Sequence, residues 1–161
     1  MNQQSHVAPT QLTCAVRAAL PGDHDEMANL AGQLGYECTA ADVRARLAEM
    51  LDPNDYAVYV AELPGGQVAG WIGVYMFRSV ELDSFAEISG LVVDQQVRSR
   101  GIGMALLSAA EQWARSHGCK VISVRSNVGR DRAHGFYASN GYEHIKTQKE
   151  FRKSLRPNPV H

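Results

Sequence analysis

Residues 92–107 read VVDQQVRSRGIGMALL, and this stretch decides the fold of the chain. An apolar strand runs through a polar turn into an amphipathic helix that begins beside Gly101 and Gly103. Two glycines one residue apart let the backbone approach a ligand closely, and the first N–H groups of a helix favour an anion. Because Arg98 and Arg100 add positive charge, the stretch predicts a diphosphate site. The alternative interpretation is a helix entry where glycine only permits a tight turn.

The glycine spacing matches neither the G-x-x-x-x-G-K-[ST] phosphate loop nor the dinucleotide-binding G-x-G-x-x-G pattern. The spacing Arg98-x-x-Gly101-x-Gly103 after an apolar strand resembles the coenzyme A pyrophosphate loop of the GNAT N-acetyltransferase family. The resemblance implies acetyl-CoA as cosubstrate. It implies that the cofactor is bound by Arg98, Ser99, Arg100, Gly101, Ile102, Gly103 and Met104.

Turn residues and hydrophobic periodicity predict an alternating order of strands and helices. Strands are expected at residues 12–19, 56–62, 68–77, 85–93, 119–126 and, as one or two, 142–155; helices are expected near 27–34, 39–51, 102–117 and 131–140. This order predicts an α/β (α+β) fold with a mixed, mostly antiparallel central sheet of six to seven strands and helices on both faces. It also matches the GNAT fold, which implies a splayed parallel pair of strands.

Composition limits the organisation of the chain. With 161 residues, we expect a single N-acetyltransferase domain at 12–155 between a flexible N-terminus at 1–11 and a flexible tail at 156–161. A net charge of −1 gives no case for a nucleic-acid partner, and no apolar run is long enough for a membrane span. The three cysteines have no metal-ligand spacing and the N-terminus lacks a signal peptide pattern, so we expect no metal and a cytoplasmic protein.

Charge is unevenly distributed along the chain. Residues 21–55 contain eight acidic and two basic side chains, whereas residues 96–161 contain twelve basic and four acidic ones. The basic half suits a polyanionic ligand and the acidic half a cationic one, although solvated helix faces alone could produce either excess.

A second motif lies at residues 132–142, RAHGFYASNGY, and resembles the late helix A-x-x-F-Y-x-x-x-G-Y of the same family. The resemblance implies that Tyr137 lies near the thioester sulfur and protonates the departing thiolate. It also implies cofactor contacts from Asn127, Arg132 and Phe136. The alternatives are a turn role for Asn127, solvation for Arg132 and core packing for Phe136.

Acyl transfer to an amine requires a free lone pair. An amine with a pKa of about 10.4 is mostly protonated at pH 7, and its deprotonation costs roughly 4–5 kcal/mol. Glu87 is the candidate base, because many family members carry a glutamate at this place; a salt-bridged or solvent-facing Glu87 is the alternative. Strand alternation places Glu87 on one face with Ser89, Leu91 and Val93 unless a bulge intervenes. In the family, main-chain groups at Leu91, Val92 and Val93 contact the pantetheine and acetyl groups.

These observations predict an N-acetyltransferase that moves the acetyl group of acetyl-CoA to a primary amine by direct attack in a ternary complex. The acceptor is expected to be a small cationic molecule or a peptide, and a homodimer is possible for this fold. The segments Gln33-Leu34-Gly35-Tyr36 and 146–153 resemble small bacterial members of the aminoglycoside type. The alternative function is a non-catalytic acetyl-CoA-binding sensor or partner-binding module.

Overall fold

The structure, a computed structural model, describes residues 13–50 and 52–156. The chain divides into two compact units, one up to Arg125 and one from Ser126 on, and each is described by itself. The first unit contains β1 Ala15–Ala18, a 3-10 turn η1 Pro21–Asp23, α1 His24–Gln33, α2 Ala40–Glu49, β2 Tyr56–Glu62, β3 Val68–Phe77, β4 Phe85–Val93, α3 Ile102–Ser116 and β5 Ile122–Val124; the second contains α4 Asp131–Ser139. The predicted flexible N-terminus and, apart from Arg156, the predicted tail lie outside the described residues.

The five strands form one sheet in the order β1-β2-β3-β4-β5. Neighbouring strands are antiparallel except for β4 and β5, which run parallel across the crossover that contains α3. The mixed α/β class is therefore confirmed. Strands β2, β3 and β4 have the predicted bounds, because turn residues such as Pro64, Gly65 and Gly66 separate apolar, β-branched and aromatic runs.

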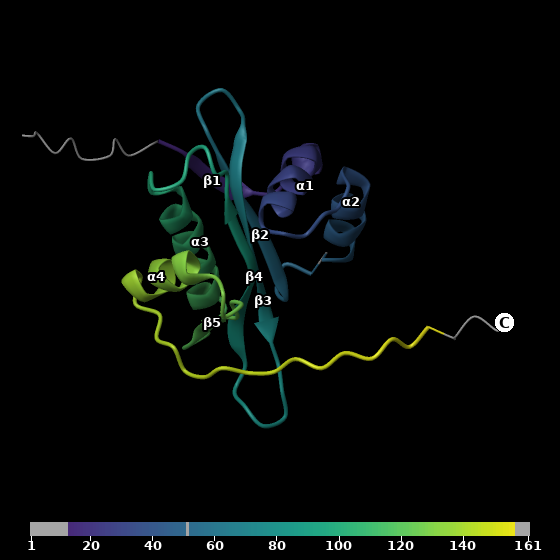
Figure 1. Cartoon of the computed structure of the whole chain (residues 1–161), viewed down its shortest axis with the longest axis vertical. Coiled ribbons are helices and arrows are strands. Elements are labelled where there is room, and N and C mark those ends of the chain that lie inside the picture. The colour runs from purple at the N-terminus through teal and green to yellow at the C-terminus, as the bar shows by residue number, and fades with distance from the viewer. Residues whose placement is uncertain (1–12, 51, 157–161) are drawn as a thin grey trace, which may run out of the picture. The chain divides into compact units, whose positions relative to one another are not determined.

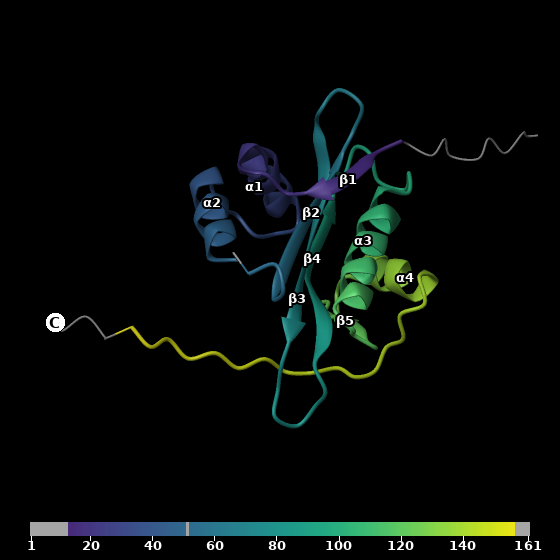
Figure 2. The same cartoon turned by 180° about the vertical axis from the view of Figure 1, so that it is seen from behind.

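Helices cover both faces of this sheet (Figures 1 and 2). On one face, the indole Nε1 of Trp71 donates a hydrogen bond to the carbonyl of Met27 in α1, at 3.2 Å. On the other face, a Cβ built on Gly70 would lie 3.1 Å from Leu106 Cδ1 in α3. The predicted apolar face of α3 is buried, and the core on that side includes Ile72, Val74, Leu106, Leu107 and Ala110. None of the described helices is long and apolar enough to cross a membrane.

Local signals account for the ends of two helices. Thr39 Oγ1 accepts a hydrogen bond from the Asp42 amide, and the Asp42 carboxylate accepts one from the Thr39 amide, so a capping box begins α2. Gly118 follows α3 with a φ of 74°, a conformation that side chains with a Cβ disfavour.

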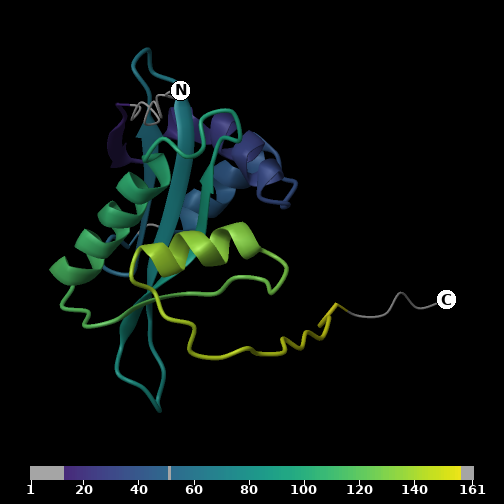
Figure 3. The ribbon, with the colours of Figure 1, turned by 60° about the vertical axis from the view of Figure 1, so that its left-hand side comes forward.

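The expectation of six to seven strands was wrong, because the described residues form five. Residues 143–155 contain no strand and are shown as a plain trace after α4 in Figure 3. An extended segment becomes a strand only when another strand satisfies its backbone groups. Residues 146–153 read KTQKEFRK, with one apolar side chain to bury, so alternation alone was a weak signal there.

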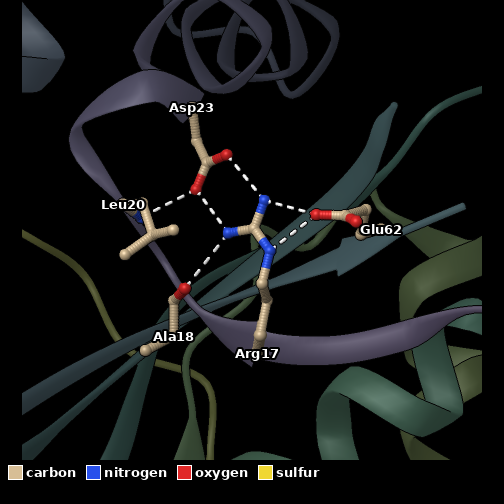
Figure 4. A network of polar contacts seen from close by, with 5 residues as sticks. All are labelled: Arg17, Ala18, Leu20, Asp23 and Glu62. Carbon is tan, nitrogen blue, oxygen red and sulfur yellow. Dashed lines mark hydrogen bonds and ion pairs between the residues drawn. The ribbon is translucent and has the colours of Figure 1, made fainter. Parts of the chain in front are cut away.

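A polar network fixes the first strand to the segment that enters α1 (Figure 4). The Arg17 guanidinium donates to both carboxylate oxygens of Asp23, at 2.8 and 2.9 Å, and to Glu62 on β2. The Asp23 carboxylate also accepts the Leu20 amide at 2.7 Å. Since Asp23 is buried, these donors compensate a charge that would otherwise be costly in the interior.

We expect Asp23→Asn to lower the free energy of unfolding at pH 7 by about 1–3 kcal/mol, because it leaves the Arg17 fork incompletely paired. Hydrogen bonds from Arg17 hold the pKa of Asp23 below its ordinary value. The wild-type stabilisation is therefore complete above about pH 4 and is lost as the pH falls through the folded-state pKa. Urea unfolding at pH 7 and at pH 2.5 should show a difference between wild type and variant that shrinks in acid.

The control is Asp83→Asn, which changes an exposed carboxylate in the β3–β4 loop and should alter stability by no more than about 0.5 kcal/mol. An equal difference between wild type and Asp23→Asn at both pH values would show that the charge of Asp23 is not the source of the effect.

Candidate active site

The glycine loop ends in a left-handed turn at the start of α3. Gly101 has a φ of 86° and occupies the N-cap position, so the N-cap residue itself has no side chain that could accept from the first turn of the helix. That first turn contains no acidic residue. Ser99 also has a positive φ, of 63°, which is uncommon outside glycine. The first N–H groups of α3 therefore face no competing side-chain carboxylate from their own turn, as an anion site requires.

The predicted cofactor-binding residues of this loop have different roles. Arg98 Nε donates to the carbonyl of Val93 at 3.0 Å, so this side chain fixes the end of β4 to the loop. The side chain of Ile102 is 1% exposed and belongs to the core, which leaves only its main chain for a ligand. Arg100 and Met104 are exposed. Arg100 is the side chain of the loop that best fits an exposed phosphate group.

Strand β4 continues beyond the residues that pair with β5. The two strands pair only from Ala86 to Ile88, whereas β4 continues to Val93. Among the described residues no other strand lies on this side of β4, since the sheet order ends at β5. The main chain of residues 89–93 therefore offers an unpaired edge that runs directly into the glycine loop, and an extended ligand can bind to such an edge. This geometry fits the implied pantetheine.

A β-bulge sits where the two strands part. The β3–β4 register pairs Val74 with Ile88 but Gly73 with Gly90, so Ser89 is an extra residue. Beyond the bulge, the side chains of β4 lie on the faces opposite to those predicted relative to Glu87. Glu87 shares its face with Val92 and with Trp71 on β3, while Leu91 and Val93 share the opposite face.

Glu87 is buried, at 5% exposure, and all its polar partners bind one oxygen. The hydroxyl of Tyr75 on β3 donates to Glu87 Oε1 at 2.7 Å, and Arg125 Nε, just after β5, donates to the same oxygen at 2.7 Å. A second guanidinium nitrogen, Nη2, completes the ion pair. Glu87 is thus salt-bridged, as one of the two sequence interpretations had it. Arg125 is the partner of this buried carboxylate, although its own side chain stays largely exposed.

Sequence reasoning missed the partners of Glu87. Tyr75 and Tyr56 stack on the same sheet face with ring centroids 5.8 Å apart, and the Tyr56 hydroxyl is hydrogen-bonded to Ser89. Burial raises the pKa of both tyrosines, so they remain neutral at physiological pH. A partial signal existed for Tyr75, because pairing the predicted strands 68–77 and 85–93 antiparallel, with Phe77 facing Phe85, places Tyr75 opposite Glu87. No local signal linked Glu87 to Arg125, which lies 38 residues away.

The second unit carries the other predicted catalytic residue. On α4, Phe136 and Tyr137 meet edge to face with ring centroids 5.4 Å apart, and Tyr137 lies 5.5 Å from the ring of Tyr142. Burial raises the pKa of Tyr137 to about 12, against a smaller opposing effect of Arg130. The phenol is therefore protonated at neutral pH and can donate a proton or a hydrogen bond.

Two further predicted cofactor residues belong to this unit. The carbonyl of Asn127 accepts the Arg130 amide at 3.0 Å, and His134 Nε2 lies 3.0 Å from the same oxygen. Asn127 thus forms the turn before α4 while its side chain stays exposed, as does that of Arg132 on the first turn of α4. The cofactor contacts implied for these two side chains stay predictions.

A recess with acidic walls lies elsewhere in the first unit, beside α1 and the start of β3. It is lined by Asp25, Glu26, Asn29, Leu30, Gln67, Val68 and Asp94 and has a volume of about 250 Å³. Three of these side chains are carboxylates, so part of the acidic excess predicted to suit a cation is gathered at one place.

Comparison with known proteins agrees with this geometry. The model of the acetyltransferase (GNAT) family matches residues 25–142. An aminoalkylphosphonate N-acetyltransferase of Salmonella typhimurium is 32% identical over 161 residues, covering 96% of this chain and 98% of that protein. An aminoglycoside N(6')-acetyltransferase type 1 of Stenotrophomonas maltophilia is 29% identical, covering 89% and 95%.

Solved structures show the same fold. The aminoglycoside N-acetyltransferase AAC(6')-Iy, in complex with CoA, superposes with a TM-score of 0.77 at 18% identity and covers 91% of this chain and 99% of that one. The family match spans both units, from α1 to the residue after Gly141. Together with the unpaired β4 edge and the glycine loop, these matches establish that the chain is an acetyl-CoA-dependent acyltransferase and belongs to the GNAT family of acetyltransferases.

Proposed function

We propose that this enzyme transfers the acetyl group of acetyl-CoA to a primary amine of a small cationic molecule or peptide, by direct attack in a ternary complex. The observation that carries the proposal is the course of β4. One strand holds a buried carboxylate at Glu87 and then an unpaired edge, and it ends in the glycine loop. A base and a site for the cofactor therefore follow one another along a single element.

Each group has a defined task in this reaction. Acetyl-CoA supplies the activated acetyl group, and the main chain of residues 89–93, the loop and the first turn of α3 bind and orient it. Glu87 accepts the proton that the acceptor amine must lose, directly or through water, which offsets the roughly 4–5 kcal/mol cost of deprotonating an amine at pH 7. Tyr137 gives its proton to the departing sulfur.

The acceptor class follows from charge and from the relatives. The acidic excess of residues 21–55 and the recess beside α1 favour a cationic acceptor. The two relatives named above are acetyltransferases for aminoglycosides and for aminoalkylphosphonates, both small amines.

The first experiment measures acetyl-CoA turnover as free-thiol release, with product mass, against aminoglycosides, aminoalkylphosphonates, polyamines and lysine peptides. An acceptor that gains one acetyl group supports the proposal and names the substrate class. Acetyl-CoA binding without turnover on any of these acceptors would contradict the acceptor class proposed here.

Substitution of Gly101 tests the loop. Gly101→Val should weaken acetyl-CoA binding by roughly tenfold or more, because loss of charge-assisted hydrogen bonds to a phosphate costs about 1.5–3 kcal/mol. The control is Gly118→Val at the other end of α3, where φ is also positive, at 74°, and no atom lies within 4 Å of an added Cβ. Both variants carry backbone strain. A difference in acetyl-CoA affinity between them, measured by calorimetric titration, therefore reports on the binding site and not on strain. Equal affinities in the two variants would remove Gly101 from the cofactor site.

Tyr137→Phe tests the general acid. It should lower kcat by about 10²–10⁴-fold with little change in acetyl-CoA affinity, since only the proton donor is lost. Because the pKa of Tyr137 is about 12, its deprotonation should produce no alkaline limb in the wild-type rate profile between pH 7 and 10. Tyr142→Phe is the control for loss of a neighbouring phenol. An alkaline limb near pH 9 that disappears in Tyr137→Phe would contradict the raised pKa, and wild-type turnover in that variant would contradict the acid role.

A further inference from the structure

The arrangement around Glu87 is asymmetric. Oε1 accepts the Tyr75 hydroxyl and Arg125 Nε, each at 2.7 Å, and pairs with Arg125 Nη2. Within residues 13–50 and 52–156, no hydrogen bond or ion pair reaches Oε2. One carboxylate oxygen is therefore fixed by the protein, and the other retains its capacity to accept a proton.

The two donors come from the two strands that flank β4. Tyr75 lies directly opposite Glu87 in the β3–β4 register, and Glu87 pairs with Ser123 on β5. Arg125 lies two residues beyond Ser123, so the alternation of an extended chain returns it to the same face. The carboxylate is thus held from both sides at the last residues before β4 and β5 part.

Burial and exposure differ sharply within the ion pair. The Glu87 side chain is 7% exposed, whereas that of Arg125 is 70% exposed. A purely structural ion pair of this kind adds little stability, because ordering an exposed arginine and burying a carboxylate both cost free energy. The Tyr75 hydroxyl donates a hydrogen bond to Glu87 and accepts one from Arg125 Nη2 at 3.1 Å, so the three side chains form one polar cluster.

We propose that Tyr75 and Arg125 are positioning residues for Glu87: they fix Oε1 and so present Oε2 to the acceptor amine. The proposal rests on the base role given to Glu87 in the proposed function. In the step concerned, an N–H bond of the acceptor breaks and an O–H bond forms at Oε2, while the nitrogen lone pair becomes the nucleophile. The proton leaves to solvent after turnover.

Three titratable or charged side chains face Glu87. From β3 and β2 these are Tyr75 and Tyr56, both with raised pKa values, and after β5 it is Arg125, whose pKa is raised chiefly by its hydrogen bond to Glu87. All three keep one protonation state between pH 5 and 9. A limb of the rate profile in that range is therefore not produced by titration of Tyr75, Tyr56 or Arg125 themselves.

The test compares kcat, KM and the pH profile of kcat/KM for Arg125→Met, Arg125→Lys and Tyr75→Phe, using the acceptor identified by the turnover screen. Arg125→Met should lower kcat by about 10–100-fold through misplacement of the carboxylate. Loss of the positive charge should also move the acid limb about one pH unit or more upward, because a buried carboxylate without its cation is harder to ionise.

The two conservative variants separate charge from geometry. Arg125→Lys should return the acid limb most of the way to its wild-type position, while kcat stays reduced about tenfold because an ammonium lacks the planar fork. Tyr75→Phe should lower kcat with a smaller upward shift of the limb, since it removes a neutral donor. KM for acetyl-CoA should change in none of the three.

Two matched controls cover non-specific effects. Arg115→Met removes an arginine with the same 70% exposure, paired with Glu111 on α3. Tyr59→Phe removes a half-buried tyrosine of β2 that pairs with Ile72, on the opposite face of the sheet. Both should retain wild-type kcat and pH profile.

The outcomes distinguish the inference from the proposed function. Wild-type kcat and acid limb in Glu87→Gln would overturn the base role itself. If Glu87→Gln is impaired but the limb and kcat of Arg125→Lys and Tyr75→Phe equal those of wild type, the base stands and the positioning proposal falls. A lower kcat without any shift of the limb in Arg125→Met, or an effect on acetyl-CoA KM alone, also overturns it. Should Arg125→Met fail to fold, as judged by circular dichroism, the other two variants decide.

Discussion

The bulge at Ser89 is the constraint on which the site depends. Before it, β4 pairs with β5; after it, the strand continues as an unpaired edge into the glycine loop. The bulge requires a glycine opposite, because a Cβ at Gly73 would lie 2.4 Å from Ser89 Oγ and 3.2 Å from the Tyr56 hydroxyl. A bulge bends its strand and increases the local twist. The unpaired edge to which we assign the cofactor thus begins at the bulge in the β3–β4 register.

The same register determines the charge balance of the site. Glu87 is one residue before the last pair of β4 with β5, so its side chain is still enclosed by both neighbours. A carboxylate buried there requires donors, and Tyr75 and Arg125 provide them. The local net charge of the carboxylate and guanidinium is close to zero. Attraction of a cationic acceptor must therefore come from more distant carboxylates, such as the three that line the recess beside α1.

The parts of the molecule that follow from contiguous sequence could be predicted. The bounds of β3 and β4 were correct, and once Phe77 is known to face Phe85, counting back places Tyr75 opposite Glu87. Gly90 inside the strand was a signal for a bulge, but a glycine does not specify which residue is extra. The bulge at Ser89 moved Leu91 and Val93 to the other face. The ion pair with Arg125 depends on a parallel register that no local pattern specifies. The strands predicted at 142–155 do not form, because β-propensity alone does not provide a partner strand.

The glycine loop and the face around Glu87 differ in how the sequence specifies them. The cofactor site that we propose is mostly main chain and lies in one continuous segment, from the end of β4 to the first turn of α3, so a short motif can specify it. The face around Glu87 is assembled from β2, β3, β4 and the residue after β5. Relatives of similar identity act on aminoglycosides and on aminoalkylphosphonates, which differ in charge. Overall identity at this level therefore follows the family and not the acceptor, which we expect to depend on side chains from several strands.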